Sequence, residues 1–257
     1  MLFGRRTLTH FCYLSMTRFT SLLRASLVLV VVVASIICSS DAATQYVNGA
    51  TIFGRCANFS VLAGASVSFN GGQTAVSTGS VGVSPGTSIT GNSVLAAGYL
   101  KESASGSATN CAADEAIAYG YLKGLTCTNK LANSDLSGVT LIPGVYCSGS
   151  GFFTLKATIL YLDAGGDANA QFIFQTATTF ITSTKTSVVL LNGALAKNIY
   201  WQVGTSATLG GTSSFIGQIL TYASITVDTS VTVVGRLYAQ AAVTFAGADR
   251  ITLPCRC

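Results

Sequence analysis

Charged side chains are scarce in this chain. Asp, Glu, Lys and Arg make up 9% of its 257 residues, whereas they make up about 25% of an average soluble domain. Hydrophobic residues make up 49%, and the length is ample for a sizeable core. The surface must therefore be covered largely by uncharged residues, above all Thr, Ser, Gly, Asn and Ala.

No apolar run is long enough for an ordinary transmembrane helix. The longest, Ala25–Cys38, has 14 residues and follows four arginines, whereas a membrane-spanning helix needs about 20. This is the length of a signal-peptide core, and the small residues Ser40 and Ala42 predict cleavage after Ala42. We therefore expect residues 1–42 to be a signal peptide and the protein to be secreted, extracellular. Met16 is an alternative start, and an uncleaved signal anchor is the alternative interpretation.

Basic clusters are also missing from the expected mature chain. Removing residues 1–42 takes away four of the 14 basic residues and one of the nine acidic ones, so the formal net charge falls from +5 to 10 − 8 = +2. No run of Lys or Arg remains, which argues against nucleic acid or an anionic membrane as partner. We expect a monomer that binds neither.

The residues of a catalytic or metal site are missing as well. The single histidine, His10, lies in the leader and the acids are scattered, so neither the usual base of a serine nucleophile nor the paired carboxylates of a glycosidase are present. Asp163 and Asp167 lie in a Gly-rich turn whose spacing does not fit an EF-hand. Asp228 is expected in a turn and Trp201 in the core. We predict a protein that is not an enzyme and holds no cofactor or metal.

Cysteine, by contrast, is plentiful after the leader. In an exported chain six cysteines indicate up to three disulfides, and a metal site is disfavoured because no CxxC pair or histidine accompanies them. We expect Cys111 to pair with Cys127 across a helix, and Cys56 to pair with one member of the C-terminal Cys-Arg-Cys. The six residues are Cys56, Cys111, Cys127, Cys147, Cys255 and Cys257.

One motif for covalent modification is present. Asn58-Phe-Ser60 fits the Asn-X-Ser/Thr acceptor sequence for N-glycosylation. Its position in an apolar stretch makes an unmodified, partly buried Asn equally consistent with the sequence.

One segment differs from the strand-like remainder. Ala108–Lys123 is rich in Ala and is followed by Gly124, which predicts a single helix over about 108–123. The rest consists of short apolar alternations separated by Gly, Asn and Pro, and no linker divides residues 43–257, so we expect one mature domain. The helix should cover a sheet with an apolar side that includes Ala112, Ala116, Tyr119 and Leu122.

A short phrase recurs near the C-terminus, and each copy starts eighteen positions after the last: Ser206-Ala-Thr208-Leu, Ser224-Ile-Thr226-Val and Ala242-Val-Thr244-Phe. This interval suits three short strands and three turns, which is one coil of a β-solenoid of roughly triangular section. A propeller blade would need about 40 residues. Strand alternation points the Ser and Thr positions outward and the intervening apolar residues inward.

These features resemble the microbial ice-binding protein family. The resemblance implies a mostly β fold, a discontinuous right-handed β-solenoid with one α-helix packed alongside, and a flat face that adsorbs to an ice crystal surface. The six mature cysteines and the Ser- and Gly-rich segment 100–109 depart from the family pattern. The motifs that carry the resemblance are Asn58–Gly64, Gly82–Gly91, Pro143–Tyr146, Asp163–Gln175, Leu191–Gly193, Trp201–Gly204 and Gly235–Gln240.

The repeated phrase also supplies candidate ice-binding residues. Thr is stiff at χ1 because it is β-branched, and an array of Thr and Ser avoids the rotamer entropy that long charged side chains lose when they are immobilised. A competing row on the next strand is formed by Thr212 and Ser214 over Ser230 and Thr232. The first-choice candidates are Ser206, Thr208, Ser224, Thr226, Thr244 and, from a fourth coil, Thr179.

Two less specific interpretations remain open. Thr favours strands without having any function there. A secreted adhesion or polysaccharide-binding solenoid is the alternative function, and it would expose aromatic platforms or a polar groove in place of a Thr/Ser face. Binding to insoluble glycans without any effect on ice growth would favour it.

Overall fold

The computed structural model describes residues 52–156 and 158–254. Within them the chain forms one α-helix, α3 (Gly106–Gly124), two 3-10 helices, η3 (Gly54–Asn58) and η4 (Ala196–Asn198), and a 20-stranded sheet. No helix in this part of the chain is long and apolar enough to cross a bilayer. The predicted signal peptide (1–42), Cys255 and Cys257 lie outside the described residues.

The strands form three stacks, each made of parallel strands from successive coils. This is a β-solenoid of three-sided section, as the repeat predicted. We call the first stack the helix-side stack. Along the solenoid it contains β6 (Asn129–Leu131), β8 (Gly144–Ser148), β11 (Phe172–Thr176), β14 (Ile199–Val203), the second halves of β16 (Ser214–Thr221) and β18 (Thr232–Ala239), β1 (Phe59–Ala63), β3 (Ser80–Val83) and β5 (Lys101–Ser103).

The other two stacks we call the Thr/Ser stack and the third stack. The Thr/Ser stack contains β9 (Phe153–Leu155), β12 (Phe180–Thr182), β15 (Ala207–Leu209), β17 (Ile225–Val227), β19 (Ala242–Phe245) and the first parts of β2 (Ser66–Val76) and β4 (Ser88–Leu95). The third stack contains β7 (Thr140–Leu141), β10 (Ile159–Asp163), β13 (Ser187–Leu191), the first parts of β16 and β18, β20 (Arg250–Thr252) and the second parts of β2 and β4.

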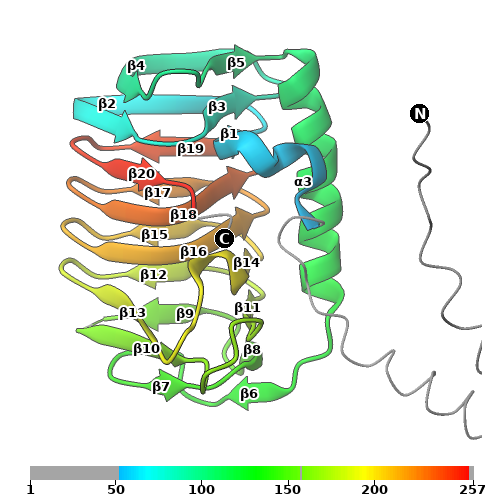
Figure 1. Cartoon of the computed structure of the whole chain (residues 1–257), viewed down its shortest axis with the longest axis vertical. Coiled ribbons are helices and arrows are strands. Elements are labelled where there is room, and N and C mark those ends of the chain that lie inside the picture. Colours follow the sequence, from blue (N-terminus) through cyan, green and yellow to red (C-terminus); the bar gives the residue numbers. More distant parts are fainter. Residues whose placement is uncertain (1–51, 157, 255–257) are drawn as a thin grey trace, which may run out of the picture. The chain divides into compact units, whose positions relative to one another are not determined.

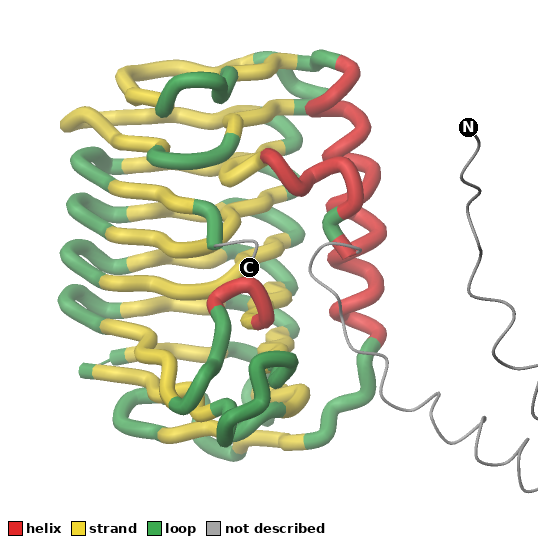
Figure 2. The backbone as a smooth tube through the Cα atoms, in the orientation of Figure 1, coloured by secondary structure: helices red, strands yellow, loops and turns green. Residues whose placement is uncertain are grey.

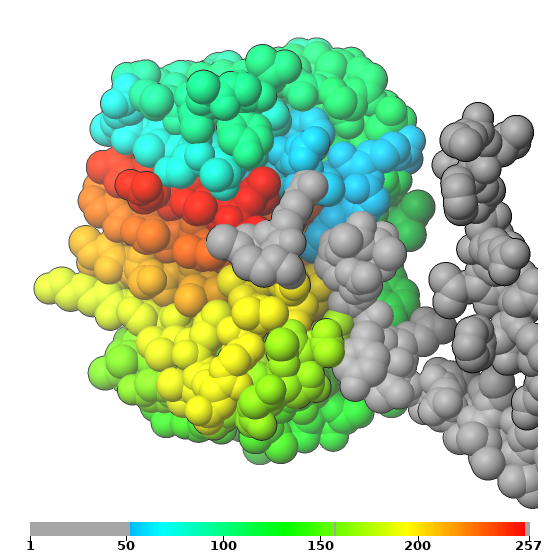
Figure 3. Space-filling view, viewed as in Figure 1, coloured from blue at the N-terminus to red at the C-terminus, as the bar shows by residue number. Residues whose placement is uncertain are grey.

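The coils do not follow sequence order along the solenoid. β18 and β19, near the C-terminus, pair with β1 and β2, near the N-terminus. The described part of the chain therefore begins inside the solenoid, builds β1–β5 towards one end, returns along the side through α3, and builds β6–β20 back towards β1 (Figures 1 and 2). In Figure 3 the cyan band of the early coils lies directly on the red band of the last ones. The discontinuity expected from the resemblance is confirmed.

The coil length predicted from the repeat holds only for the last coils. Ala207, Ile225 and Val243 are register partners 18 residues apart, whereas Phe153, Phe180 and Ala207 are partners 27 residues apart. The extra residues lie between the third and helix-side stacks, where residues 164–171 and η4 connect the strands. β16 and β18 instead run through this corner without a break. Asp163 and Asp167 accept hydrogen bonds from the backbone N–H groups two residues further on, at 2.8 Å each, as turn residues do.

The core runs along the inside of the solenoid. Trp201 is 1% exposed, its ring centroid lies 3.9 Å from that of Phe174 and 4.5 Å from that of Phe180, and its indole N–H donates to the Ile216 carbonyl oxygen. Every inward residue predicted from the repeat is buried, and the expectation that Trp201 is a core residue is confirmed. The buried repeat residues are Ala207, Leu209, Ile225, Val227, Val243 and Phe245.

The helix packs on the helix-side stack, and the predicted apolar side is confirmed for Tyr119 and Leu122, which are buried. It begins at Gly106, where the Ser105 hydroxyl accepts the Ala108 N–H. Ala116 is exposed and Ala112 is only half-buried, so the prediction was wrong for Ala116. Alanines on several sides leave the apolar side undefined by sequence. The buried helix residues are Ala108, Cys111, Glu115, Ala118, Tyr119 and Leu122, and they face Leu62, Ile173, Tyr200, Leu220 and Tyr238 of the stack.

Both predicted disulfide pairings are wrong. The structure joins Cys56 to Cys111 and Cys127 to Cys147. Cys111 lies near the start of α3 and Cys127 beyond its end, so the rise of about 1.5 Å per residue separates them by roughly 20 Å. A disulfide needs Cα atoms about 4.4–6.8 Å apart. Each end of the helix is thus fastened to a different coil.

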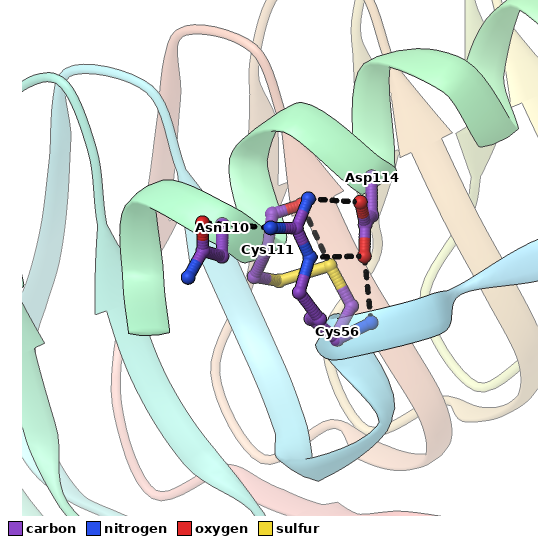
Figure 4. Close-up of polar contacts among 5 residues, drawn as sticks. Cys56, Asn110, Cys111 and Asp114 are labelled. Carbon is purple, nitrogen blue, oxygen red and sulfur yellow. Dashed lines mark hydrogen bonds and ion pairs between the residues drawn. A yellow bond between two sulfur atoms is a disulfide. The ribbon is translucent and has the colours of Figure 1, made fainter. Parts of the chain in front are cut away.

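An ion pair reinforces the first of these attachments. The Arg55 guanidinium donates to the Asp114 carboxylate at 2.6 Å and to the Asn110 side-chain oxygen at 2.7 Å, and the Arg55 backbone N–H donates to Asp114 at 2.6 Å (Figure 4). The hydrogen bonds from Arg55 lower the pKa of Asp114. Together with the adjacent Cys56–Cys111 bond, they fasten η3 to α3.

A buried carboxyl between helix and sheet predicts a pH-dependent stability. Burial raises the pKa of Glu115 to about 7, although a hydrogen bond from Gln240 acts to lower it. The Glu115 Oε1 atom has no hydrogen-bond partner among the described residues. Because the folded state holds this proton more tightly than the unfolded state, the free energy of unfolding should fall between about pH 4.5 and pH 7, by up to about 3 kcal/mol. Glu115→Gln should remove this component. Urea unfolding at pH 4.5 and pH 8 tests it, and equal pH dependence in both proteins would contradict it.

Candidate functional site

The outward residues of the Thr/Ser stack form two rows across its seven strands. Each residue in a row lies beside the next one on the neighbouring strand. Row B contains Thr154, Ile181, Thr208, Thr226, Thr244, Ser68 and Thr90. Thr154, at one end of the row, is buried, and its hydroxyl donates to the Ser134 carbonyl oxygen. Row A lies two residues earlier in the sequence, on three of the strands and directly before the other four, and contains Phe152, Thr179, Ser206, Ser224, Ala242, Ser66 and Ser88.

The rows form a regular two-dimensional array. No register shift occurs between the strands where the rows cross them; the irregularity between β2 and β4 comes later, after Phe69. Neighbouring parallel strands lie about 4.8 Å apart, and residues i and i+2 about 6.6 Å apart. Six such steps make each row roughly 29 Å long. The array therefore has a fixed repeat in both directions.

A packed layer beneath the rows holds them in place. The inward residues between rows A and B are buried except for the half-buried Ile89, and the Phe69 and Phe245 rings stack with centroids 4.9 Å apart. Within the rows, the Thr90 hydroxyl donates to the Ser68 hydroxyl at 3.3 Å. β-branched side chains on such a layer retain little rotamer freedom. The array is therefore rigid before it meets any partner.

The rows carry hydroxyl and apolar groups and no charge. Thr226 and Thr90 are exposed, Thr208, Thr244 and Ser68 are half-buried, and Ile181 is 44% exposed. The described residues contain no group of three or more His, Cys, Asp or Glu side chains that could hold a metal ion. Asp228, which follows β17, accepts the Thr229 N–H at 2.8 Å, as the predicted turn residue should. The array offers repeated weak contacts in place of reactive groups.

All six first-choice residues predicted from sequence lie in these rows. Thr179 also lies next to Ser206, because the Phe180 N–H donates to the Ser206 carbonyl oxygen. The sequence reasoning missed the row members that come from the N-terminal coils and, apart from Thr179, those that come from the longer coils. Ser66-Val-Ser68 and Ser88-Ile-Thr90 repeat the alternation of Ser224-Ile-Thr226, so a search for that alternation at any spacing would have found them.

The competing row is only partly on a strand. Ser214 and Thr232 are register partners in the third stack, but Thr212 and Ser230 lie in turns with φ of 56° and 64°, so their assignment to the strand was wrong. The row through Ser214 and Thr232 continues to Arg250, whose long side chain is exposed. A charge therefore interrupts that surface, whereas rows A and B have none.

The fold and these rows can be compared with known proteins. The model of the family described as Ice-binding-like matches residues 61–251, which include β2 to β19 and most of β1 and β20. The chain belongs to the ice-binding-like family. An ice-binding protein from Nostoc sp. (strain HG1) is 37% identical over 80% of this chain and 75% of the relative. One from Flavobacterium frigoris (strain PS1) is 34% identical over 78% of this chain and 75% of the relative.

Solved structures of ice-binding proteins share the architecture. The crystal structure of one from an Antarctic biological consortium superposes with a TM-score of 0.74 at 34% identity, covering 79% of this chain and 90% of that one. The structure from the Antarctic ascomycete Antarctomyces psychrotrophicus gives a TM-score of 0.72 at 34% identity, covering 78% and 96%. The fold predicted from the repeat and from the family resemblance is confirmed.

Proposed function

We propose that the protein is exported from the cell and adsorbs to ice through rows A and B, so that it inhibits ice growth and recrystallisation. The observation that carries this proposal is the uncharged, in-register array, made mostly of Thr and Ser, over seven parallel strands. Relatives that bear the name ice-binding protein support the choice of partner. Export is supported by the leader-like N-terminus and by two disulfides, which persist in oxidising compartments.

A regular array suits a partner that is itself a lattice. Thr methyl groups can pack into hollows of an ordered water layer while the hydroxyl groups form hydrogen bonds in register with it. Each contact is weak, but a rigid face loses little conformational entropy when it binds, so the contacts add over its length. An adsorbed molecule holds the ice front where it sits, and the front must then curve outward between bound molecules, which slows growth.

The stacks differ in how well they fit this partner. Helix α3 covers the helix-side stack, and the third stack exposes the charged side chain of Arg250. Long charged side chains interrupt a regular water layer and lose rotamer entropy when they are immobilised. The Thr/Ser stack combines exposure, regular spacing and lack of charge, so we assign the ice contact to it.

The test is to watch a single ice crystal in a solution of the disulfide-intact protein while it is cooled below its melting point. We expect arrested growth and a faceted crystal, because adsorption blocks particular ice planes. Rounded, unrestricted growth at high protein concentration would overturn the proposal. In that case, retention on insoluble polysaccharide would support the adhesion interpretation.

A further inference from the structure

The glycosylation motif near the N-terminus is not used by the proposed ice face. Asn58 is the last residue of η3 and is exposed, whereas the next two residues, Phe59 and Ser60, are 3% and 0% exposed at the start of β1. The acceptor side chain therefore reaches solvent although the rest of the motif is buried. The structure resolves the choice that the sequence left open between an exposed and a partly buried Asn58.

The position of Asn58 separates it from the ice face. β1 pairs with β18 and β3 in the helix-side stack, and η3 is fastened to α3 through Cys56 and Arg55. Figure 1 shows η3, in blue, between the solenoid and α3, whereas rows A and B lie on a different side of the triangular coil. A large group on Asn58 would therefore not stand between rows A and B and their partner.

We propose that Asn58 carries an N-linked oligosaccharide when the chain is exported through a eukaryotic secretory pathway; this rests on the export proposed above. The donor class is a lipid-diphosphate-linked oligosaccharide. The bond between Asn58 Nδ2 and the first sugar's C1 forms, and the C1–O bond to the diphosphate breaks. Nδ2 loses one proton, and the lipid diphosphate leaves with the electron pair of the broken bond.

Burial of the motif fixes when this transfer can occur. The enzyme that transfers the oligosaccharide must bind Ser60 of the acceptor motif. In the folded protein the Ser60 hydroxyl is buried and lies 3.4 Å from the Ser80 carbonyl oxygen. The disulfide at Cys56, two residues before Asn58, can form only after the ribosome has added Cys111 to the chain. Transfer must therefore precede the folding of β1, and slower disulfide formation should raise the fraction of modified chains.

The low charge of the surface gives the oligosaccharide a role. Charged residues make up only 9% of the chain, and a net charge near zero favours self-association. An N-linked oligosaccharide is bulky and solubilising, and on Asn58 it would supply hydration while leaving the ice face uncovered. We therefore expect the modified protein to stay soluble at higher concentration with its ice activity unchanged.

The experiment expresses the full chain in yeast, once with its own N-terminus and once behind an established cleavable yeast leader. Translocated protein is treated with peptide:N-glycosidase F, and the peptide that begins at Cys56 is analysed by mass spectrometry. We expect a loss of mass and conversion of Asn58 to Asp. Asn58→Gln and Ser60→Ala should abolish the shift, whereas Ser60→Thr, which keeps the acceptor motif, should retain it.

The outcomes separate this proposal from the export proposal. Translocated wild-type protein with unmodified Asn58 in both expressions would overturn the glycosylation site. A shift only behind the yeast leader would support the site and overturn the interpretation of residues 1–42 as a signal peptide. A shift that persists in Asn58→Gln would place the sugar elsewhere and also overturn the proposal. Mild reduction during synthesis should raise the modified fraction, and a lower fraction would contradict the order of events.

Discussion

Replacing Thr226 with Tyr is expected to weaken adsorption to ice roughly tenfold or more, about 1.4 kcal/mol or more of adsorption free energy, and so to reduce ice-growth arrest sharply at equal protein concentration. Thr226 is exposed in the middle of row B, between Thr208 and Thr244. A Tyr ring there would stand above its neighbours and hold the rest of the array away from the ice surface. The fold should survive because the side chain points into solvent. The measurement is the freezing-point gap on single crystals, with circular dichroism to check the fold.

The matched control is Thr232→Tyr. Thr232 is also an exposed Thr on a strand, in the third stack between Ser214 and Arg250. We expect it to keep wild-type activity, since a bulky residue there leaves rows A and B unobstructed. Unchanged activity in folded Thr226→Tyr would show that the face was assigned wrongly. Loss of activity in Thr232→Tyr alone would move the ice contact to the third stack.

Removing the first disulfide should have the largest effect on stability. The Cys56–Cys111 bond spans 55 residues of sequence, and the chain-entropy relation gives about 4 kcal/mol for a loop of that length. The double variant Cys56→Ala, Cys111→Ala should lose that much free energy of unfolding. Urea denaturation at fixed pH measures it. The comparison variant Cys127→Ala, Cys147→Ala opens a loop of 20 residues and should lose less, about 3 kcal/mol.

The same bond should affect the ice face. Its loop contains β1–β5, which supply Ser66, Ser68, Ser88 and Thr90 to the two rows. These coils do not follow β19 directly in the sequence. Their register with β19 therefore depends on sheet pairing, on α3 and on this disulfide. We expect the Cys56/Cys111 variant to lose ice activity at a lower temperature than the Cys127/Cys147 variant. The reverse order would show that the early coils hold their register without the disulfide.

The sequence alone determined the local geometry of this protein. A short repeat in which apolar and polar residues alternate predicts strands separated by turns. It correctly assigned Leu209 to the inside of the solenoid and Thr208 to the outside. Scarce charge predicted an uncharged surface, and the Ala-rich segment predicted the helix, because each of these properties depends on residues close together in the chain.

Only the tertiary structure decided which distant segments meet. Coils of several different lengths stack in one register, and the first coils lie on the last, so row members such as Ser68 are not found by a fixed spacing. The pairing of Cys56 with Cys111 follows from where η3 meets α3, and the buried side of α3 follows from the sheet it covers. These features depend on contacts between residues far apart in sequence, and the number of residues between two positions does not determine the distance between them in the folded protein.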